Sequence, residues 1–241
     1  MKAILMAAGV GSRISRNIHG PKCTLDVGGE PLIHKTVSML IRNNIKVAVV
    51  LGYENAFIKD ALKDLPVEYY YNPFYRVTNS IASLWFARDF MDEDLILANA
   101  DVFWEQDILA ELLKEKHPIT MLADKSRVNK GDYFFNVELD YLVDYGKELT
   151  REQRTSEYVG IAKITSENNQ LSLFKKHLEE MIDLGQYDLW WENVLYEYLK
   201  SMPVYVKDVS DYFWAEIDYI SDYKRIKEYI QSGDISIKLN D

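Results

Sequence analysis

Two glycines and two cations near the start of the chain could together hold phosphate groups. Gly9 and Gly11 follow an apolar run, and Arg13 and Lys22 come shortly after them. Glycine lets the backbone approach a ligand closely and adopt positive φ, and successive amides in such a turn can cradle an anion. These residues therefore predict a phosphate site. A tight turn after a strand, with no ligand, is the alternative.

A carboxylate further along the chain favours the first reading. The segment matches neither a P-loop nor the dinucleotide fingerprint, since Ile14 stands where the fingerprint has its third glycine. However, Asp101 directly follows the apolar run at 95–99. An amide cradle, two cations and a carboxylate are the parts of a site for a nucleotide with Mg²⁺. Taken alone, Asp101 could equally cap the next helix.

Alternating strands and helices must position these residues. Their predicted bounds are strands at 3–8, 46–51, 67–71, 95–99 and 119–123, and helices at 31–43, 55–63, 78–90 and 106–116. This alternation predicts an α/β fold with a Rossmann-like, mostly parallel mixed sheet flanked by helices. Ligands bind beyond the carboxyl ends of the strands in such a sheet, where the glycine turn and Asp101 fall.

The second half of the chain has a different pattern. Antiparallel strands are predicted at 133–143 and 157–164, with turns at 130–131 and 144–146; helices at 166–184, 189–200 and 221–230; and short strands near 204–206 and 214–217. No linker separates the halves. We therefore expect a single domain, 1–241, in which the second half is an insertion that shapes a substrate pocket.

Composition excludes several classes of protein. The 241 residues carry 28 basic and 38 acidic side chains, a net charge of -10, which argues against binding to nucleic acid or an anionic membrane. The single cysteine, Cys23, cannot form an internal disulfide, which suits a cytoplasmic location. The N-terminus lacks the pattern of a signal peptide, and no apolar stretch is long enough to predict a membrane span.

Three separated pieces of the sequence resemble the sugar-phosphate nucleotidyltransferase superfamily. Residues 6–13 (MAAGVGSR), 21–22 (PK) and 31–33 (PLI) follow, in order and spacing, a family signature that reads roughly LAAGxGxR, PKxL and PLI. Segments at 72–75, 78–80, 188–193 and 214–218 are similar to the small bacterial cytidylyltransferases for choline phosphate, aminoethylphosphonate and phosphoglutamine. The chain departs from the family at 14–20, where Arg16 and His19 have no family counterpart.

The resemblance implies a nucleotide-diphospho-sugar transferase-like fold and roles for four charged residues. Arg13 would steady the leaving pyrophosphate, and Lys22 would lie against the α-phosphate or the attacking oxygen. Asp101 and Asp218 would bind Mg²⁺, although Asp218 could instead cap the following helix.

The resemblance also divides the chain into a nucleotide-binding half, 1–125, and an acceptor-binding half, 126–241. The nucleotide-binding residues would be Ala7, Ala8, Gly9, Gly11, Ser12, Gly52, Tyr53, Asn79 and Ser80. The acceptor-binding residues would be Lys125, Trp190, Glu192, Trp214 and Glu216. Each set has a plainer alternative: helix capping for the polar residues of the first, and a solvated lysine or glutamate and core tryptophans for the second.

We therefore expect an enzyme that transfers CMP from CTP to a small phosphorylated or phosphonate acceptor and releases pyrophosphate. A sugar- or polyol-phosphate nucleotidyltransferase that uses another nucleoside triphosphate is the alternative within the same class. A non-catalytic nucleotide-binding regulatory module is the alternative from a different class. The sequence leaves the oligomeric state open, and a homodimer is compatible with it.

Overall fold

Nine strands form one mixed sheet in the order β3-β2-β1-β4-β9-β6-β10-β8-β7, and β11 pairs with β5 in a small second sheet. This computed structural model describes residues 1–11, 20–129 and 131–239. The strands are β1 (Lys2–Ala7), β2 (Lys46–Leu51), β3 (Val67–Tyr71), β4 (Leu95–Asn99), β5 (Val102–Phe103), β6 (Ile119–Asp124), β7 (Phe134–Glu138), β8 (Tyr141–Gly146), β9 (Ser156–Ile164), β10 (Tyr205–Asp208) and β11 (Ala215–Glu216). The α-helices are α1 (Leu32–Arg42), α2 (Asn55–Ala61), α3 (Ser80–Phe86), α4 (Gln106–Lys114), α5 (Gln170–Asp183), α6 (Asn193–Tyr196) and α7 (Ile220–Ser232).

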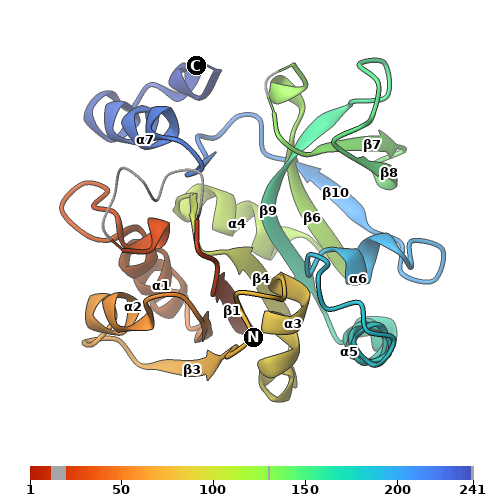
Figure 1. Ribbon diagram of the computed structural model, residues 1–241. Helices are drawn as coiled ribbons and strands as arrows, with labels where there is room; N and C mark the ends of the chain where they lie inside the picture. Colours follow the sequence, from red (N-terminus) through yellow and green to blue (C-terminus); the bar gives the residue numbers. More distant parts are fainter. Residues whose placement is uncertain (12–19, 130, 240–241) are drawn as a thin grey trace.

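Helices cover both faces of the sheet around strand β1 (Figure 1). β1 pairs in parallel with β2 on one side and β4 on the other. Its side chains alternate, so Ala3 and Leu5 pack with α1, α2 and α4, whereas Ile4 packs with α3 and α5 on the opposite face. Burial on both faces explains why β1 is an unbroken apolar run.

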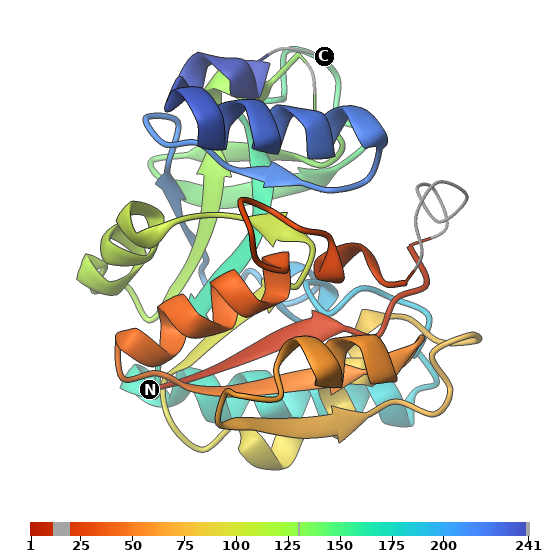
Figure 2. The same cartoon turned by 90° about the vertical axis from the view of Figure 1, so that its left-hand side faces the viewer.

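β9 joins the parallel part of the sheet to the strands of the second half. It lies between β4 and β6 and is antiparallel to both, and all nine of its residues are buried. Beyond it, β6 and β10 pair in parallel, and the β7–β8 hairpin completes the sheet (Figure 2). The α/β class is confirmed. The parallel arrangement predicted for the strands of the first half holds for β3, β2, β1 and β4.

Three local predictions in the elements were wrong. The turn predicted at 144–146 lies inside β8; the chain reverses instead at Leu139 and Asp140, which both have positive φ. The predicted helix at 189–200 is reduced to α6. The predicted helix at 78–90 is α3 followed by a short 3-10 helix, Arg88–Phe90. Local sequence patterns suggested these elements, but tertiary packing determines where each of them begins and ends.

The C-terminal helix α7 closes a third, smaller core. Its Ile226 packs with Leu32, Phe103 and Ile217. The amide of Ile217 donates to the carbonyl of Asp101 at 3.0 Å, so β11 is held against the segment that follows β4. This packing brings Asp218, far away in sequence, to the carboxyl end of the sheet. No helix among the described residues has the length and apolar character needed to cross a membrane.

Candidate active site

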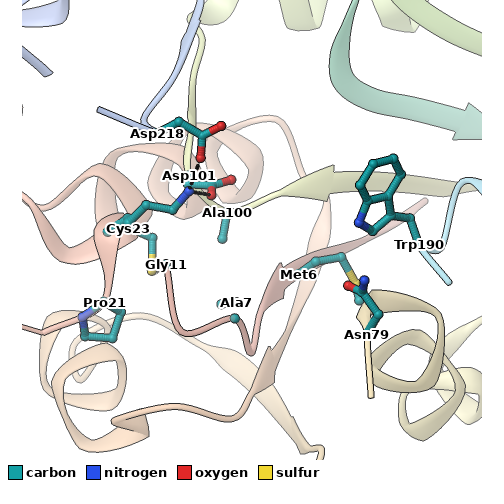
Figure 3. Close-up of a pocket in the computed structure, with 12 residues that line it drawn as sticks. Met6, Ala7, Gly11, Pro21, Cys23, Asn79, Ala100, Asp101, Trp190 and Asp218 are labelled. Carbon is teal, nitrogen blue, oxygen red and sulfur yellow. Dashed lines mark hydrogen bonds and ion pairs between the residues drawn. The ribbon is translucent and has the colours of Figure 1, made fainter. Parts of the chain in front are cut away.

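The carboxyl ends of β1 and β4 meet at one edge of the sheet. The two strands are parallel neighbours, and the amide of Ala100 donates to the carbonyl of Met6 at 3.2 Å. A cavity of about 330 Å³ lies beyond this edge. Its lining includes Met6, Ala7, Gly9, Gly11, Pro21, Lys22, Cys23, Asn79, Ala100, Asp101, Trp190 and Asp218. In Figure 3, Asp101 and Asp218 lie on one side of this cavity, and Asn79 and Trp190 lie on the other.

Lys22 lies between the two carboxylates. Its Nζ is 2.7 Å from Asp101 Oδ2 and 2.8 Å from Asp218 Oδ1, and the three side chains are largely buried. Burial alone would lower the pKa of the Lys22 ammonium, but the two carboxylates outweigh it and raise that pKa above its usual value. Lys22 is therefore a fully charged cation held at the edge of the cavity.

Gly11 makes room for the Lys22 side chain. Its φ is +62°, a left-handed conformation that favours glycine. A Cβ at this position would lie 2.9 Å from Lys22 Cγ. A Cβ at Gly9, by contrast, would have no atom within 4 Å, so the Gly9 backbone borders open space in the cavity. The two glycines therefore have separate functions: one accommodates the lysine and the other leaves room for a ligand.

The paired carboxylates fit a divalent metal. Asp101 and Asp218 converge on a single cationic group, and Lys22 Nζ marks the point where a positive charge is favoured. Mg²⁺ in nucleotide enzymes is usually held by one or two carboxylates, with phosphate oxygens and water completing its shell. The donor set on this edge of the sheet matches that requirement, and family membership, described below, is consistent with a divalent metal.

A second cavity, of about 200 Å³, adjoins the first over the end of β1. Ala8, Gly9, Asn79, Ser80 and Tyr75 contribute to its lining. Asn79 caps α3, because its Oδ1 accepts a hydrogen bond from the Ser80 amide at 2.8 Å. The helix capping considered for Asn79 is therefore present. Gly52 does not line the cavity but packs against its wall, since a Cβ there would lie 2.6 Å from the carbonyl oxygen of Ala8. The Tyr53 amide donates to that same carbonyl at 3.2 Å.

A third cavity, of about 180 Å³, is lined by aromatic and acidic side chains. The aromatic residues are Tyr133, Tyr158, Trp190 and Tyr196, and the acidic residues include Glu192, Glu216 and Asp218. The Tyr133 ring stands edge-on to Trp190 and stacks on Tyr196, with centroids 5.3 Å and 5.8 Å apart. Because Asp218 lines this cavity and the first one, the two cavities share a wall.

Glu192 is a buried carboxylic acid in the third cavity. Burial raises its pKa to about 8, an effect that the nearby Asn99 and Tyr158 side chains counteract only in part. Burial also raises the pKa of Glu216 well above its usual value, and repulsion from Asp101 and Asp218 adds to that shift. A cavity in which carboxylates are this hard to ionise favours a positively charged ligand.

The structure brings together some of the predicted site residues and separates others. Trp214 does not line the third cavity, and its Nε1 donates to Asp124 at 2.9 Å. It lines a further cavity, of about 420 Å³, to which Glu216 and Asp218 also contribute. Lys125 is exposed and lies 3.9 Å from Asp208, outside the three cavities. The other predicted nucleotide and acceptor residues lie at or beside the cavities, except those that the structure does not describe: Ser12 and Arg13, with Arg16 and His19, lie outside the described residues.

Sequence reasoning missed the tyrosines of the third cavity and Asn99. Asn99 ends β4, and its Oδ1 accepts the indole N–H of Trp191 at 3.0 Å. A polar residue at the carboxyl end of a buried strand was an available signal for Asn99. No local pattern distinguished Tyr133, Tyr158 and Tyr196 among the 17 tyrosines of the chain.

A triphosphate with its metal suits this sheet edge better than an uncharged substrate does, which indicates a nucleotidyltransferase. The comparison with protein families agrees. A model described as the MobA-like NTP transferase domain matches residues 3–180, most of the chain, and the chain belongs to that family. The family resemblance and the enzyme class predicted from the sequence are confirmed.

Curated relatives span nearly the whole chain. The chain is 25% identical to the CTP:phosphoglutamine cytidylyltransferase of Campylobacter jejuni, with 92% of this chain and 97% of the relative covered. It is 28% identical to the choline-phosphate cytidylyltransferase of Haemophilus influenzae, covering 94% and 96%.

Solved structures show the same fold. The CTP:phosphocholine cytidylyltransferase of Streptococcus pneumoniae superposes with a TM-score of 0.78 at 19% identity, covering 95% of this chain and 98% of that chain. The inositol-1-phosphate CTP transferase of T. maritima superposes with a TM-score of 0.75 at 20% identity, covering 96% of each.

Proposed function

We propose that this enzyme transfers CMP from CTP to a small phosphorylated or phosphonate acceptor and releases pyrophosphate. The observation that carries the proposal is the shared wall between a phosphate-type cavity and an aromatic, acidic cavity, with Asp218 facing both. The activities named for the curated relatives support CTP as the nucleotide and a small phosphorylated molecule as the acceptor.

The chemistry needs alignment and charge neutralisation more than proton transfer. An oxygen of the acceptor phosphate attacks the α-phosphorus of CTP, the bond between the α-phosphorus and its bridging oxygen breaks, and pyrophosphate leaves with that oxygen. The attacking oxygen is already anionic near neutral pH, so no general base is required. The protein must offset the repulsion between the two anions and hold them in line.

We assign this task to the residues at the carboxyl edge of the sheet. Lys22 would move from between the carboxylates onto the α-phosphate or the attacking oxygen. The backbone at Gly9 and Gly11 would border the triphosphate, and Arg13 would steady pyrophosphate. The base would lie in the second cavity near Ala8, Asn79 and Ser80, with Ala7, Ser12, Gly52 and Tyr53 supporting the nucleotide.

Asp101 and Asp218 would hold Mg²⁺, which, when bound, supplies positive charge beside the reacting phosphates. We place the non-reacting end of the acceptor in the third cavity, against Trp190, Glu192 and Glu216. Residues 1–241 would act as one domain, because β9 of the acceptor-binding half pairs with β4 and β6 of the nucleotide-binding half. The single buried cysteine supports a cytoplasmic location.

A pyrophosphate-release screen tests the proposal. Four nucleoside triphosphates are each paired with phosphocholine, phosphoethanolamine, aminoethylphosphonate and several sugar 1-phosphates, in the presence of Mg²⁺. We expect turnover with CTP and at least one of the three non-sugar acceptors. Turnover only with another nucleotide and a sugar phosphate would contradict the proposal, and no turnover with any pair would favour a regulatory module.

Variants connect the activity to the site. Asp101→Ala is expected to lower kcat/KM by two orders of magnitude or more while the protein stays folded. Lys114→Ala is the control, because Lys114 is an exposed lysine that pairs with Glu111 on α4. A near-normal rate in Asp101→Ala would remove Asp101 from the mechanism.

A further inference from the structure

Two tyrosine hydroxyls are buried in the third cavity. They belong to Tyr158 on β9 and Tyr196 on α6, and both side chains line the cavity. Among the described residues, the hydroxyl of Tyr196 has no hydrogen-bond partner, and that of Tyr158 interacts with the Glu192 carboxylate without reaching standard hydrogen-bond geometry. Burial and then the Glu192 carboxylate raise the pKa of both phenols, so the hydroxyls lie near that carboxylate. A buried hydroxyl without a partner destabilises the protein, which makes such a group more typical of a binding site than of a core.

The carboxylate beside these hydroxyls also lacks a cation. Glu192 is 6% exposed. Among the described lining residues, only Lys147 is cationic, and its Nζ lies over the Trp190 ring, 5.8 Å from the centroid, without an ion pair to Glu192. Lys22 is held by Asp101 and Asp218 instead. The cavity therefore presents oxygen acceptors to its contents and offers them little positive charge.

We propose that Glu192, Tyr158 and Tyr196 select an acceptor whose far end is a primary ammonium group. The inference rests on the proposed function and narrows its acceptor class. A primary ammonium carries three N–H donors, one for each of the three oxygen-bearing side chains, and its charge neutralises the Glu192 carboxylate. The surrounding rings of Tyr133 and Trp190 add a cation–π attraction that depends little on the number of N–H groups.

Other head groups satisfy this cavity less completely. A trimethylammonium group has the charge but no N–H donor, so neither tyrosine hydroxyl would accept a hydrogen bond from it. A neutral hydroxyl group can donate a hydrogen bond but supplies no positive charge to stabilise the ionised form of Glu192. Each lost hydrogen bond to a buried partner corresponds to a decrease of about tenfold in kcat/KM, and more where the partner is charged.

A methylation series tests the inference. Phosphoethanolamine, its N-methyl and N,N-dimethyl derivatives and phosphocholine carry the same positive charge, and each step replaces one N–H donor with a methyl group. We expect kcat/KM with CTP to fall along the series, by at least about tenfold between its ends. An equal or higher value for phosphocholine overturns the inference while leaving the proposed function intact. No pyrophosphate release with any acceptor, including the sugar phosphates, overturns the proposed function itself.

Conservative variants identify the residues responsible. Tyr158→Phe and Tyr196→Phe should each reduce the ratio of kcat/KM for phosphoethanolamine to kcat/KM for phosphocholine by about tenfold. Most of this change should be a lower kcat/KM for the primary amine. Without ligand, Tyr196→Phe should unfold at the same or a higher denaturant concentration than the wild type, because its hydroxyl has no partner among the described residues. Tyr145→Phe is the control, since Tyr145 stacks on Tyr196 with centroids 4.2 Å apart but does not line the cavity. An unchanged series in both test variants overturns the assignment.

Discussion

Replacing Lys22 with methionine would leave Asp101 and Asp218 facing each other without the cation that separates them. Lys22→Met keeps most of the side-chain stem, so the packing against Gly11 is largely preserved. The variant therefore isolates the contribution of the charge. It should make the protein less stable without metal and more responsive to metal than the wild type is.

The geometry gives the size of the effect. One oxygen of each carboxylate lies within 2.8 Å of Lys22 Nζ, and the three side chains are 13% to 20% exposed. Breaking a buried ion pair by removing one partner typically destabilises a protein by about 3–5 kcal/mol. Because these side chains keep some contact with water, we expect the lower end, about 3 kcal/mol, in a buffer that contains a chelator.

Equilibrium unfolding with and without Mg²⁺ measures both parts of the effect. At about 100 times its dissociation constant, a ligand that binds only the folded state adds about 2.7 kcal/mol. Lys22→Met should gain this stability at a lower Mg²⁺ concentration than the wild type does, because the ammonium of the wild type already occupies the space between the carboxylates. The double variant Lys22→Met/Asp218→Asn should recover stability in chelator, since one of the two repelling charges is gone. If Lys22→Met is as stable as the wild type in chelator, the electrostatic reasoning is wrong.

Three further outcomes are expected. Gly11→Ala should destabilise the protein by about 1–2 kcal/mol and reduce kcat, because φ is +62° and the new Cβ would meet Lys22; Gly9→Ala should leave unfolding almost unchanged. The raised pKa of Glu192 means that the folded state binds its proton more tightly than the unfolded state, so wild-type stability should fall as pH rises from about 4.5 to about 8. Glu192→Gln lacks this titration, so the difference in stability between the wild type and this variant should change over that range, by at most about 5 kcal/mol. A difference that stays constant would refute the pKa shift. Trp214→Phe should cost about 2 kcal/mol through the lost hydrogen bond to Asp124 and leave the order of acceptors unchanged, whereas a changed order would restore Trp214 to the acceptor pocket.

The nucleotide side of the site was largely predictable because it follows from topology. Parallel strands present their carboxyl ends at one edge of a sheet, so Gly9 and Asp101 were both expected at that edge. The pairing of β1 with β4 then brings the two residues to the same cavity. Lys22 follows the glycine turn closely enough to reach the same place. Asp218 was found through the family resemblance, since its position depends on the packing of α7 against a third core.

The acceptor side could not be read from local patterns. Tyr158 lies on a strand whose residues are all buried, and Tyr196 lies on a helix of four residues, so neither shows a periodicity that separates a pocket residue from a core residue. Trp214 was expected in the acceptor pocket, and its indole N–H is used by the buried Asp124. Both cases depend on which polar partner the tertiary structure supplies, and sequence spacing does not encode that.

The position of β9 limits how this enzyme could be recombined with its relatives. The strand hydrogen-bonds to β4 of the nucleotide-binding half and to β6, and it also carries Tyr158 of the third cavity. A chimera joined after residue 125 would graft a foreign strand into the middle of a nine-stranded sheet, where its whole surface must match new neighbours. Exchanging only the β7–β8 hairpin and the segment around α6 would alter the cavity wall from the edge of the sheet. Acceptor preference should therefore be easier to change by replacing these peripheral segments than by swapping halves.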